Sequence, residues 1–268
     1  MPGTPITQVV AVAERGRSGL VATACGVLVA AGLLAVTVYA ASRTDTSLPT
    51  TAPTAADALP ATTTEPARPA AEAVRPAPSR TRERAVAGDW ITRTSRSTGI
   101  GPVALKAYGA AALRLADEQP SCRLGWTTLA GIGAIESGHG TTGGRALRVD
   151  GTTSRRIVGP ALDGTAGTIA IPSDTDSVRW HGDTAWDHAV GPMQFIPSTW
   201  RKWGSDGNGD GVEDPNNVFD AAYAAARYLC ASGGDLTTGE GWSRAVFSYN
   251  HSEAYVRAVL ARANDYAG

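Results

Sequence analysis

Lysine is nearly absent from this chain of 268 residues, and so is an excess of charge of either sign. Lys106 and Lys202 are the only two lysines, and the formal net charge is -1. Proteins that bind nucleic acid through its phosphates usually carry a clear positive excess, which is missing here. The composition therefore argues against a nucleic-acid partner.

Clusters of histidine and cysteine with the spacing of a zinc site are also missing, so a catalytic zinc is not expected. Cysteine itself is scarce. Cys25 lies inside a long apolar run, whereas Cys122 and Cys230 lie in the later part of the chain. If that part is exported, where thiols can be oxidised, we expect Cys122 and Cys230 to form one disulfide. Two buried free thiols are the alternative.

Charged side chains are absent from residues 19–41, a stretch longer than the roughly 20 apolar residues that cross a bilayer. Arg15 and Arg17 precede it, so the positive-inside rule places residues 1–18 in the cytoplasm and the rest of the chain outside. This pattern predicts a single-pass anchor in the cell membrane. The alternative is a signal peptide that is cleaved after a small-residue site near residues 38–40, which would release a secreted protein.

Large apolar residues are almost absent from residues 42–97, which are rich in Pro, Ala, Thr and Arg. The segment has neither a helical nor a strand period and cannot bury enough surface to offset its ordering entropy. It is therefore predicted to be a disordered linker that holds a folded domain away from the membrane.

Residues 98–268 are predicted to form one mainly α domain. Gly101-Pro102 marks the start of a first helix, because proline is favoured in the first helical turn. Further helices are expected over residues 126–137, 197–203, 217–232, 242–250 and 252–266. Residues 141–190 are rich in Gly, Asp, Thr and Pro and predict a long irregular insertion, with short strands near Ile157 and Ile169. Loops of this length in compact domains tend to be functional.

One carboxylate stands in an unusual setting, because Glu136 ends the apolar part of GIGAIESGHG, residues 131–140. An apolar environment disfavours the charged form of a glutamate and raises its pKa. A glutamate of this kind can act as a general acid near neutral pH, and glycoside cleavage commonly needs one. Taken alone, however, Glu136 is better explained as a cap on a neighbouring helix.

Two further segments combine amides with aromatic rings. GPMQFIPSTW contains Gln194, and FSYNHSEAYV contains Tyr249, Asn250 and Tyr255. Aromatic faces and amide groups suit a groove for sugars, which present apolar ring faces, hydroxyls and acetamido groups. The alternative is that these polar groups merely satisfy one another in the core.

Four segments in a common order resemble the membrane-bound lytic murein transglycosylase B family: GIGAIESGHG, GPMQFIPSTW, DGNGDGVEDPNNVFDAAYAAARYL and FSYNHSEAYV. RIVGPALDG and GDTAWDHAVGPMQF are similar to its actinobacterial branch. The resemblance covers residues 100–268 and implies a lysozyme-like helical domain that acts on peptidoglycan. It implies that Glu136 is the single catalytic acid/base. It also implies that five residues line the cleft: Ser137, Gln194, Tyr249, Asn250 and Tyr255.

The implied reaction cleaves the β-1,4 bond between N-acetylmuramic acid and N-acetylglucosamine. Glu136 protonates the glycosidic oxygen and then takes the proton of the C6 hydroxyl, which attacks C1 and leaves a 1,6-anhydromuramoyl end. One carboxylate can then suffice where most glycosidases use two, although Asp187 stays open as a spatial neighbour. A hydrolytic muramidase and a non-catalytic peptidoglycan-binding module are the alternatives. Besides glycan strands, proteins of cell-wall synthesis or division stay open as partners.

The segment DGNGDG, residues 206–211, begins like a calcium-binding loop. Asp206, Asn208 and Asp210 offer oxygen ligands at alternate positions, which suits a hard cation. Gly211 permits the sharp turn, and the next ligand would be the backbone carbonyl of Val212.

The end of this loop departs from the usual pattern, because Asn217 stands at the twelfth position in place of glutamate. In the resembling family the last ligand comes from the position of Asp220, and Asp214 is an alternative. We expect a structural Ca²⁺ here, with sodium or a metal-free turn as the other readings.

Overall fold

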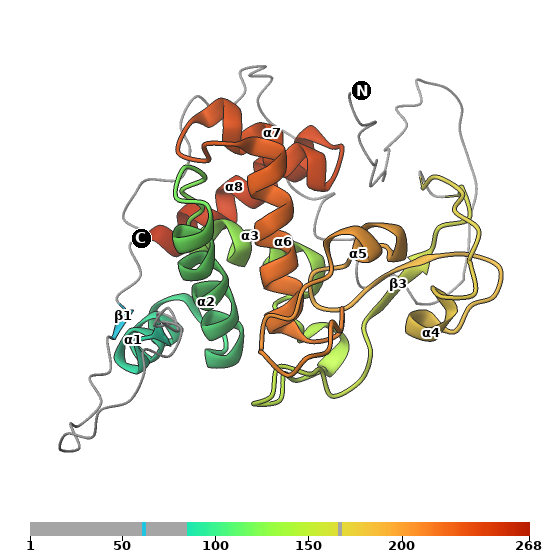
Figure 1. Cartoon of the computed structure of the whole chain (residues 1–268), viewed down its shortest axis with the longest axis horizontal. Helices are drawn as coiled ribbons and strands as arrows, with labels where there is room; N and C mark the ends of the chain where they lie inside the picture. The colour runs from blue at the N-terminus through green and yellow to red at the C-terminus, as the bar shows by residue number, and fades with distance from the viewer. Residues whose placement is uncertain (1–60, 63–84, 166–167) are drawn as a thin grey trace, which may run out of the picture. The chain divides into compact units, whose positions relative to one another are not determined.

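The computed structural model describes residues 61–62, 85–165 and 168–268 (Figure 1). The predicted cytoplasmic segment and anchor, residues 1–41, and most of the predicted linker lie outside this part. Within the described residues, no helix has the length and apolar character needed to cross a membrane. The described domain is mainly helical, as predicted.

Helices dominate the chain order, with two short two-stranded antiparallel sheets, β1–β2 and β3–β4. The elements are β1 (Ala61–Thr62), β2 (Ala85–Val86), α1 (Gly88–Thr98), α2 (Pro102–Glu118), α3 (Trp126–Ser137), a 3₁₀ turn (Thr142–Gly144), β3 (Val158–Ala161), α4 (Val178–His181), β4 (His188–Val190), α5 (Pro197–Trp203), α6 (Val218–Gly233), α7 (Gly239–Tyr249) and α8 (Glu253–Ala267). The expected helices all form, with ends within three residues of the predicted positions.

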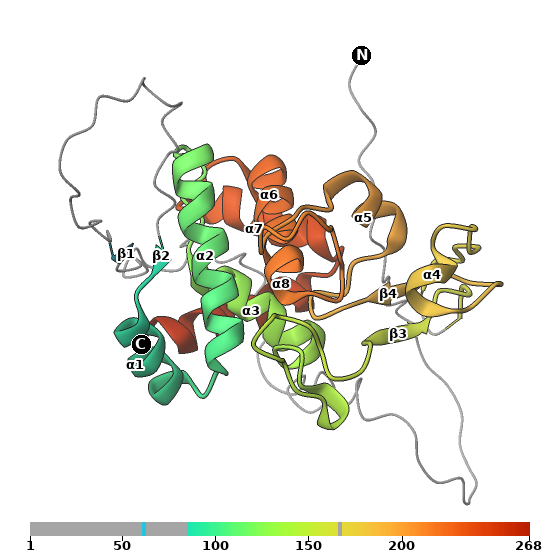
Figure 2. The same ribbon diagram turned by 60° about the horizontal axis from the view of Figure 1, so that its bottom comes forward.

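The core lies among α2, α3, α6, α7 and α8. The main pairs are α3 with α8, α2 with α6, and α6 with α7, while the sheet β3–β4 and α4 lie to one side (Figures 1 and 2). Small side chains allow this packing, because Ala221, Ala222 and residues 224–226 of α6 are fully buried alanines.

Helix α3 contains glycines because its backbone lies very close to two neighbouring helices. A Cβ atom at Gly131 would lie 2.9 Å from the carbonyl oxygen of Val259 on α8. A Cβ atom at Gly133 would lie 2.1 Å from the hydroxyl oxygen of Tyr108 on α2. The glycines before Glu136 are therefore packing positions, and they bring the end of α3 against its neighbours.

The linker prediction is wrong at its C-terminal end, because residues 88–98 form helix α1. Trp90 is its anchor and packs edge-on against Trp126, with ring centroids 5.2 Å apart. Asp89 and Arg93 add an exposed ion pair at 2.6 Å. A single tryptophan gives the sequence no visible helical period. The contact between Trp90 and Trp126 therefore accounts for the formation of α1.

The predicted disulfide is present between Cys122 and Cys230. It joins the loop before α3 to the last turns of α6, across a sequence separation of 108 residues. A crosslink over so long a loop removes many conformations from the unfolded chain and stabilises the fold by that route.

The insertion of residues 141–190 is irregular, as predicted, and contains only short elements. Strand β3 begins directly after Ile157, whereas Ile169 lies outside any strand and is 46% exposed. The partner of β3 is β4, which the sequence did not predict. It leads directly into a tight hairpin, in which Val190 and Phe195 exchange both backbone hydrogen bonds, at 2.9 and 3.0 Å.

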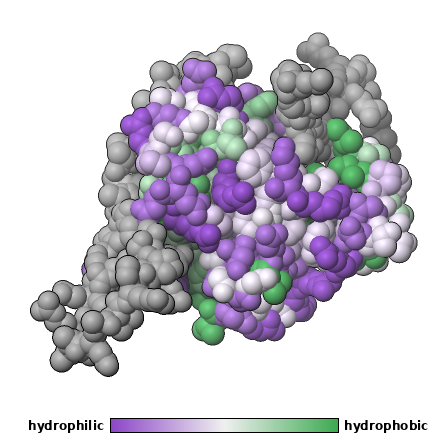
Figure 3. All heavy atoms as spheres, in the orientation of Figure 1, coloured by the Kyte–Doolittle hydropathy of each residue, from purple (hydrophilic) through white to green (hydrophobic). Residues whose placement is uncertain are grey.

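The surface in the view of Figure 3 is mostly hydrophilic or intermediate, and its hydrophobic residues form small separate groups. Large hydrophobic side chains that are exposed in the described part are Ile135, Val149, Ile169 and Val212. These positions are scattered along the sequence. Recognition by this domain is therefore expected to depend on polar groups and concave sites more than on a broad apolar patch.

Candidate active site

Glu136 lies in the last turn of α3, and Gly138, with φ of 56°, ends the helix in the left-handed conformation. The carboxylate Oε1 accepts a hydrogen bond of 2.5 Å from the hydroxyl of Tyr255. Tyr255 is buried in the first turn of α8, where the Ser252 side chain caps the helix. The packing of α3 on α8 therefore joins two predicted site residues that are 119 positions apart.

Burial raises the pKa of Glu136 to about 7, and the hydrogen bond from Tyr255 opposes that rise. The negative end of the α3 dipole acts in the same direction as burial. Burial also raises the pKa of Tyr255 well above its usual value, so its hydroxyl stays a proton donor to the carboxylate. Glu136 can thus be protonated or ionised near neutral pH, as a group that acts first as acid and then as base requires.

We expect a Tyr255→Phe variant to shift the pH profile of the reaction. Tyr255 lowers the pKa of Glu136 by stabilising the carboxylate, so its loss should raise that pKa above about 7. The limb on which activity falls as Glu136 loses its proton should then move to higher pH. The pH dependence of kcat/KM on peptidoglycan, compared between variant and parent, measures this shift. An unmoved or acid-shifted limb would show that Tyr255 does not control the ionisation of Glu136.

Ser137 connects the end of α3 to the hairpin of residues 190–195. Its Oγ donates a hydrogen bond of 2.5 Å to the carbonyl of Pro192 and accepts one of 2.8 Å from the Gly140 N–H. It is buried, so it is placed to hold the hairpin beside Glu136. The predicted role in contacting the sugar remains a prediction.

Gln194 occupies the left-handed region, with φ of 50°, which is uncommon for a residue other than glycine. Its Nε2 donates to the carbonyl of Gly191 at 2.9 Å. Gly159 on β3 passes close to the amide, since a Cβ atom there would lie 2.8 Å from Gln194 Oε1. Backbone strain of this kind clusters at functional sites, which supports the prediction that Gln194 belongs to one.

Tyr249 and Asn250 lie at the end of α7, and Tyr249 contacts the same hairpin. Tyr249 is 2% exposed, and its hydroxyl donates to the carbonyl of Met193 at 2.7 Å. Because that hydroxyl is engaged, Tyr249 is placed to support the hairpin. The buried Oδ1 of Asn250 has no hydrogen-bond partner in the described structure, and its contact with a sugar remains a prediction.

His139 connects α2 with α8 through the hydroxyl groups of two tyrosines, and the sequence did not indicate this connection. Its ring nitrogens lie 3.2 Å from the hydroxyl of Tyr108 and 3.0 Å from that of Tyr266. Burial lowers the pKa of His139 to about 4, so the ring is neutral at pH 7. Its φ of 60° is a second departure from the usual backbone regions. The two tyrosines are 31 and 127 positions away, and no local pattern could have revealed them.

Asp187, which the sequence left open as a second acid, has another partner. Its Oδ1 lies 3.3 Å from Nε2 of His181, and both side chains are almost fully buried. Among the described residues the hydrogen-bond partner of the Glu136 carboxylate is Tyr255. The arrangement therefore fits chemistry that uses Glu136 without help from Asp187.

The predicted metal loop is closed by its own backbone hydrogen bonds. The two oxygens of Asp206 accept N–H groups of residues 209–211, and Asp220 accepts those of Gly207, Asn208 and Asp214. Burial raises the pKa of Asp220 to about 6. Carboxylate and amide oxygens suit a hard cation. The described residues nevertheless contain no group of three or more His, Cys, Asp or Glu side chains that could hold a metal ion.

Comparison with protein families connects part of this domain to known chemistry. Residues 170–247 match the Transglycosylase SLT domain. The SLT match includes Gln194 and the loop from Asp206 to Asp220, whereas Glu136 and Tyr255 lie outside it. A search of curated proteins finds no match.

Solved structures that are similar to this chain include one of a lytic transglycosylase. Escherichia coli Slt35 in complex with bulgecin A is 16% identical, with a TM-score of 0.40, over 66% of this chain and 78% of that one. SltB3 from Pseudomonas aeruginosa in complex with NAG-anhNAM-pentapeptide is 17% identical, with a TM-score of 0.39, over 70% of this chain and 69% of that one. At these values neither structure assigns a role to a residue of this chain.

Proposed function

We propose that this protein is a lytic transglycosylase that cleaves peptidoglycan between N-acetylmuramic acid and N-acetylglucosamine. The match of residues 170–247 to an SLT domain supports the class of reaction. The observation that carries the proposal is the hydrogen bond from Tyr255 to Glu136, whose pKa lies at about 7. A carboxyl with that pKa can deliver a proton and recover one at neutral pH.

In the proposed reaction, protonated Glu136 donates its proton to the glycosidic oxygen as the bond to C1 breaks. The hydroxyl of Tyr255 stabilises the carboxylate that is left. Glu136 then removes the proton of the muramoyl C6 hydroxyl, whose oxygen bonds to C1. The net reaction consumes no water, and the glutamate returns to its protonated form with a 1,6-anhydro ring on the product.

Hydrolysis of the same bond by water is the competing route, and the products distinguish the two. We expect mass spectrometry of digested peptidoglycan to show muropeptide ends about 18 mass units, one water, below the reducing ends that hydrolysis leaves. The nucleophile at C1 is the only difference between the routes. A digest that contains reducing ends alone would identify a muramidase and contradict the transglycosylase proposal.

We also propose that residues 19–41 anchor the chain in the cell membrane, with the SLT domain outside the cytoplasm. The uncharged stretch after Arg15 and Arg17 supports this topology. The disulfide of Cys122 and Cys230 is in accord with an oxidising compartment. Cleavage of the segment, and hence secretion, would be shown by a mature N-terminus beyond residue 41.

We propose that residues 206–220 bind Ca²⁺ through Asp206, Asn208, Asp210, the Val212 carbonyl and Asp220. A bound cation would offset the repulsion between these carboxylates and stabilise the loop. We expect chelator to lower the melting temperature and added Ca²⁺ to restore it, and Asp206→Asn to remove this response. Asp176→Asn, an exposed aspartate of the insertion, is the control. A melting temperature indifferent to chelator would exclude the site.

A further inference from the structure

The turn of residues 181–188 joins α4 to β4 and leads into the hairpin of residues 190–195. We call it the histidine turn, because an aspartate side chain contacts each of its two histidines. Nε2 of His188 lies 3.0 Å from Oδ2 of Asp183, and the rings of His188 and His181 have centroids 5.0 Å apart. The histidine turn is therefore ordered by its own side chains, although the proposed reaction uses none of them.

His188 holds a backbone carbonyl of the neighbouring strand. Its Nδ1 lies 2.8 Å from the carbonyl oxygen of Gly159 on β3. A carbonyl oxygen can only accept, so Nδ1 carries the proton of this hydrogen bond. On the other side of the ring, the hydrogen bond from His188 lowers the pKa of Asp183 to about 2, so the carboxylate is ionised and accepts as well. The ring is thus held between two acceptors, which fix its orientation.

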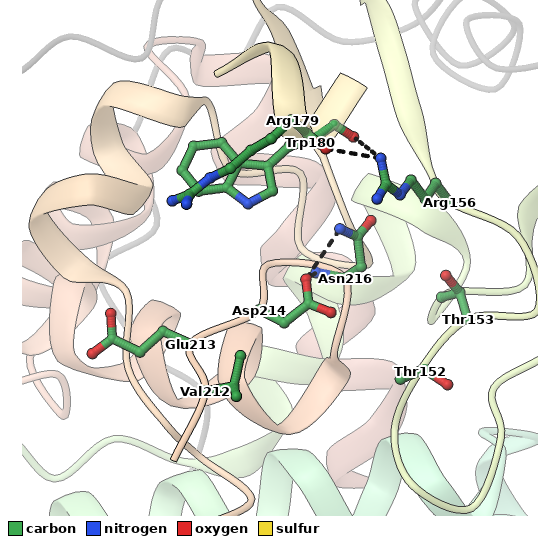
Figure 4. A pocket seen from close by; sticks show the side chains of 9 residues that line it. All are labelled: Thr152, Thr153, Arg156, Arg179, Trp180, Val212, Glu213, Asp214 and Asn216. Atoms are coloured by element: carbon green, nitrogen blue, oxygen red, sulfur yellow. Dashed lines mark hydrogen bonds between the residues drawn. The ribbon is translucent and has the colours of Figure 1, made fainter. Parts of the chain in front are cut away.

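The histidine turn is also joined to the start of β3. Arg156 lies just before that strand, and its Nη1 donates to the carbonyl oxygens of Arg179 and Trp180 on α4, at 2.9 and 3.5 Å (Figure 4). Helix α4 ends at His181, the first residue of the histidine turn. Both ends of the turn are therefore tied to the segment that contains β3, one through Arg156 and the other through His188.

Strand β3 departs from regular pairing at the point that His188 contacts. Between two paired positions it has two residues, Gly159 and Pro160, where β4 has only Ala189. An extra residue of this kind is a β-bulge, and bulges next to active sites redirect the chain. Because Gly159 has no side chain, the Gln194 amide can approach it, and a Cβ atom there would lie 2.8 Å from Gln194 Oε1. The end of Gln194 therefore rests on the backbone whose carbonyl His188 holds.

The amide of Gln194 is held through its nitrogen. The Gly191 carbonyl accepts both the backbone N–H of Gln194, at 3.1 Å, and its Nε2, at 2.9 Å. Its Oε1 has no hydrogen-bond donor among the described residues, so its position depends on packing against Gly159. An amide oxygen in this place can accept a hydroxyl or an acetamido N–H of a sugar. A displacement of Gly159 would change the direction in which this acceptor points.

We propose that His188 is a positioning residue for glycan binding, an inference that rests on the proposed function. By holding the Gly159 carbonyl, His188 keeps the bulge against Gln194 and orients its Oε1 toward the sugar. His188 itself does not touch the glycan, and Asp183 supports it by fixing the ring. Loss of the contact with Gly159 should therefore weaken binding through Gln194 alone.

The test measures how the full chain binds a stem-free tetrasaccharide of alternating N-acetylglucosamine and N-acetylmuramic acid, by calorimetric titration. Every sample carries Glu136→Gln, so that the ligand is not cleaved. His188→Gln keeps an amide donor toward Asp183 but removes the donor to Gly159, whereas His188→Asn places an amide donor near the position of Nδ1. We expect His188→Gln to weaken binding about tenfold, roughly one hydrogen bond to the sugar, and His188→Asn to retain most of the affinity.

A double-mutant cycle with Gln194→Ala distinguishes positioning from a general structural role. If His188 acts through Gln194, His188→Gln should cost no further affinity once Gln194 has been replaced. Gly159→Ala is a second variant that leaves the histidine turn intact, because its methyl group would meet the flexible end of Gln194 at 2.8 Å. It should weaken binding as His188→Gln does. Gly88→Ala, whose added Cβ atom meets nothing within 4 Å, is the matched control and should not.

Four results would overturn the proposal. These are losses from His188→Gln and Gln194→Ala that multiply, equal affinities of His188→Gln and His188→Asn, a His188→Gln chain that does not fold, and a tetrasaccharide that does not bind at all. Cleavage of peptidoglycan by the parent tests the proposed function separately. Cleavage together with binding that ignores His188→Gln would leave the proposed function standing and remove the positioning role. Binding that depends on His188, without cleavage by the parent, would do the reverse.

Discussion

The Glu136→Gln variant is expected to lose glycan cleavage almost completely, with kcat reduced by about 10²–10⁴-fold or more. Glutamine keeps the size of the side chain and can still accept the hydrogen bond from Tyr255. It cannot give a proton to the glycosidic oxygen or remove one from the C6 hydroxyl. Both proton transfers of the proposed reaction therefore fail, while the contact between α3 and α8 remains.

The stability of this variant should also depend on pH in a defined direction. The pKa of Glu136 is raised from 4.5 to about 7 in the folded protein. Folding therefore favours the protonated form, and the parent loses stability as the pH rises from about 4.5 through 7. Glutamine does not ionise, so the variant does not lose this part of its stability. The melting temperature of the variant, measured relative to that of the parent, should therefore be higher at pH 8 than at pH 4.

Release of muropeptides and thermal melting at both pH values measure these two effects. Glu253→Gln is the control, because Glu253 is an exposed glutamate at the start of α8 and lies outside the contact with Tyr255. Equal lysis by Glu136→Gln and the parent would remove Glu136 from the chemistry. A variant that is inactive and also unfolded at every pH would show that Glu136 is needed for the fold.

Sequence reasoning succeeded where the signal was local. Pro102 and Pro197 mark the starts of α2 and α5, and Gly138 marks the end of α3, because proline and glycine act on the backbone at their own positions. The pairing of Cys122 with Cys230 was also predicted, since both lie in the part expected to be exported.

The remaining features depend on contacts between distant residues. Helix α1 is ordered by one tryptophan that packs on Trp126, and strand β4 exists because β3 pairs with it. The family resemblance placed Tyr255 in the same cleft as Glu136 without predicting their hydrogen bond, and the neighbours of His139 had no signal at all. A chain of hydrogen bonds across 31 to 127 positions leaves no period in the sequence.

Gly191→Ala is expected to destabilise the fold by roughly 3 kcal/mol or more, at the upper end of what single substitutions do. Its φ of 77° costs a residue with a Cβ atom about 1–2 kcal/mol. The new methyl group would in addition lie 1.7 Å from the carbonyl oxygen of Pro215, and 2.7 Å from its carbonyl carbon. Both are backbone atoms, so no side-chain rotation can relieve the clash.

Gly182→Ala separates these two causes, because Gly182 has a φ of 84° and nothing within 4 Å of the added Cβ atom. It should show the cost of the left-handed backbone alone, about 1–2 kcal/mol. Unfolding in denaturant measures both variants. Equal losses would mean that the hairpin moves away from Pro215 at little cost. A much larger loss for Gly191→Ala would show that residues 190–195 are held rigidly between Ser137 and Pro215, because only a fixed hairpin makes the clash unavoidable.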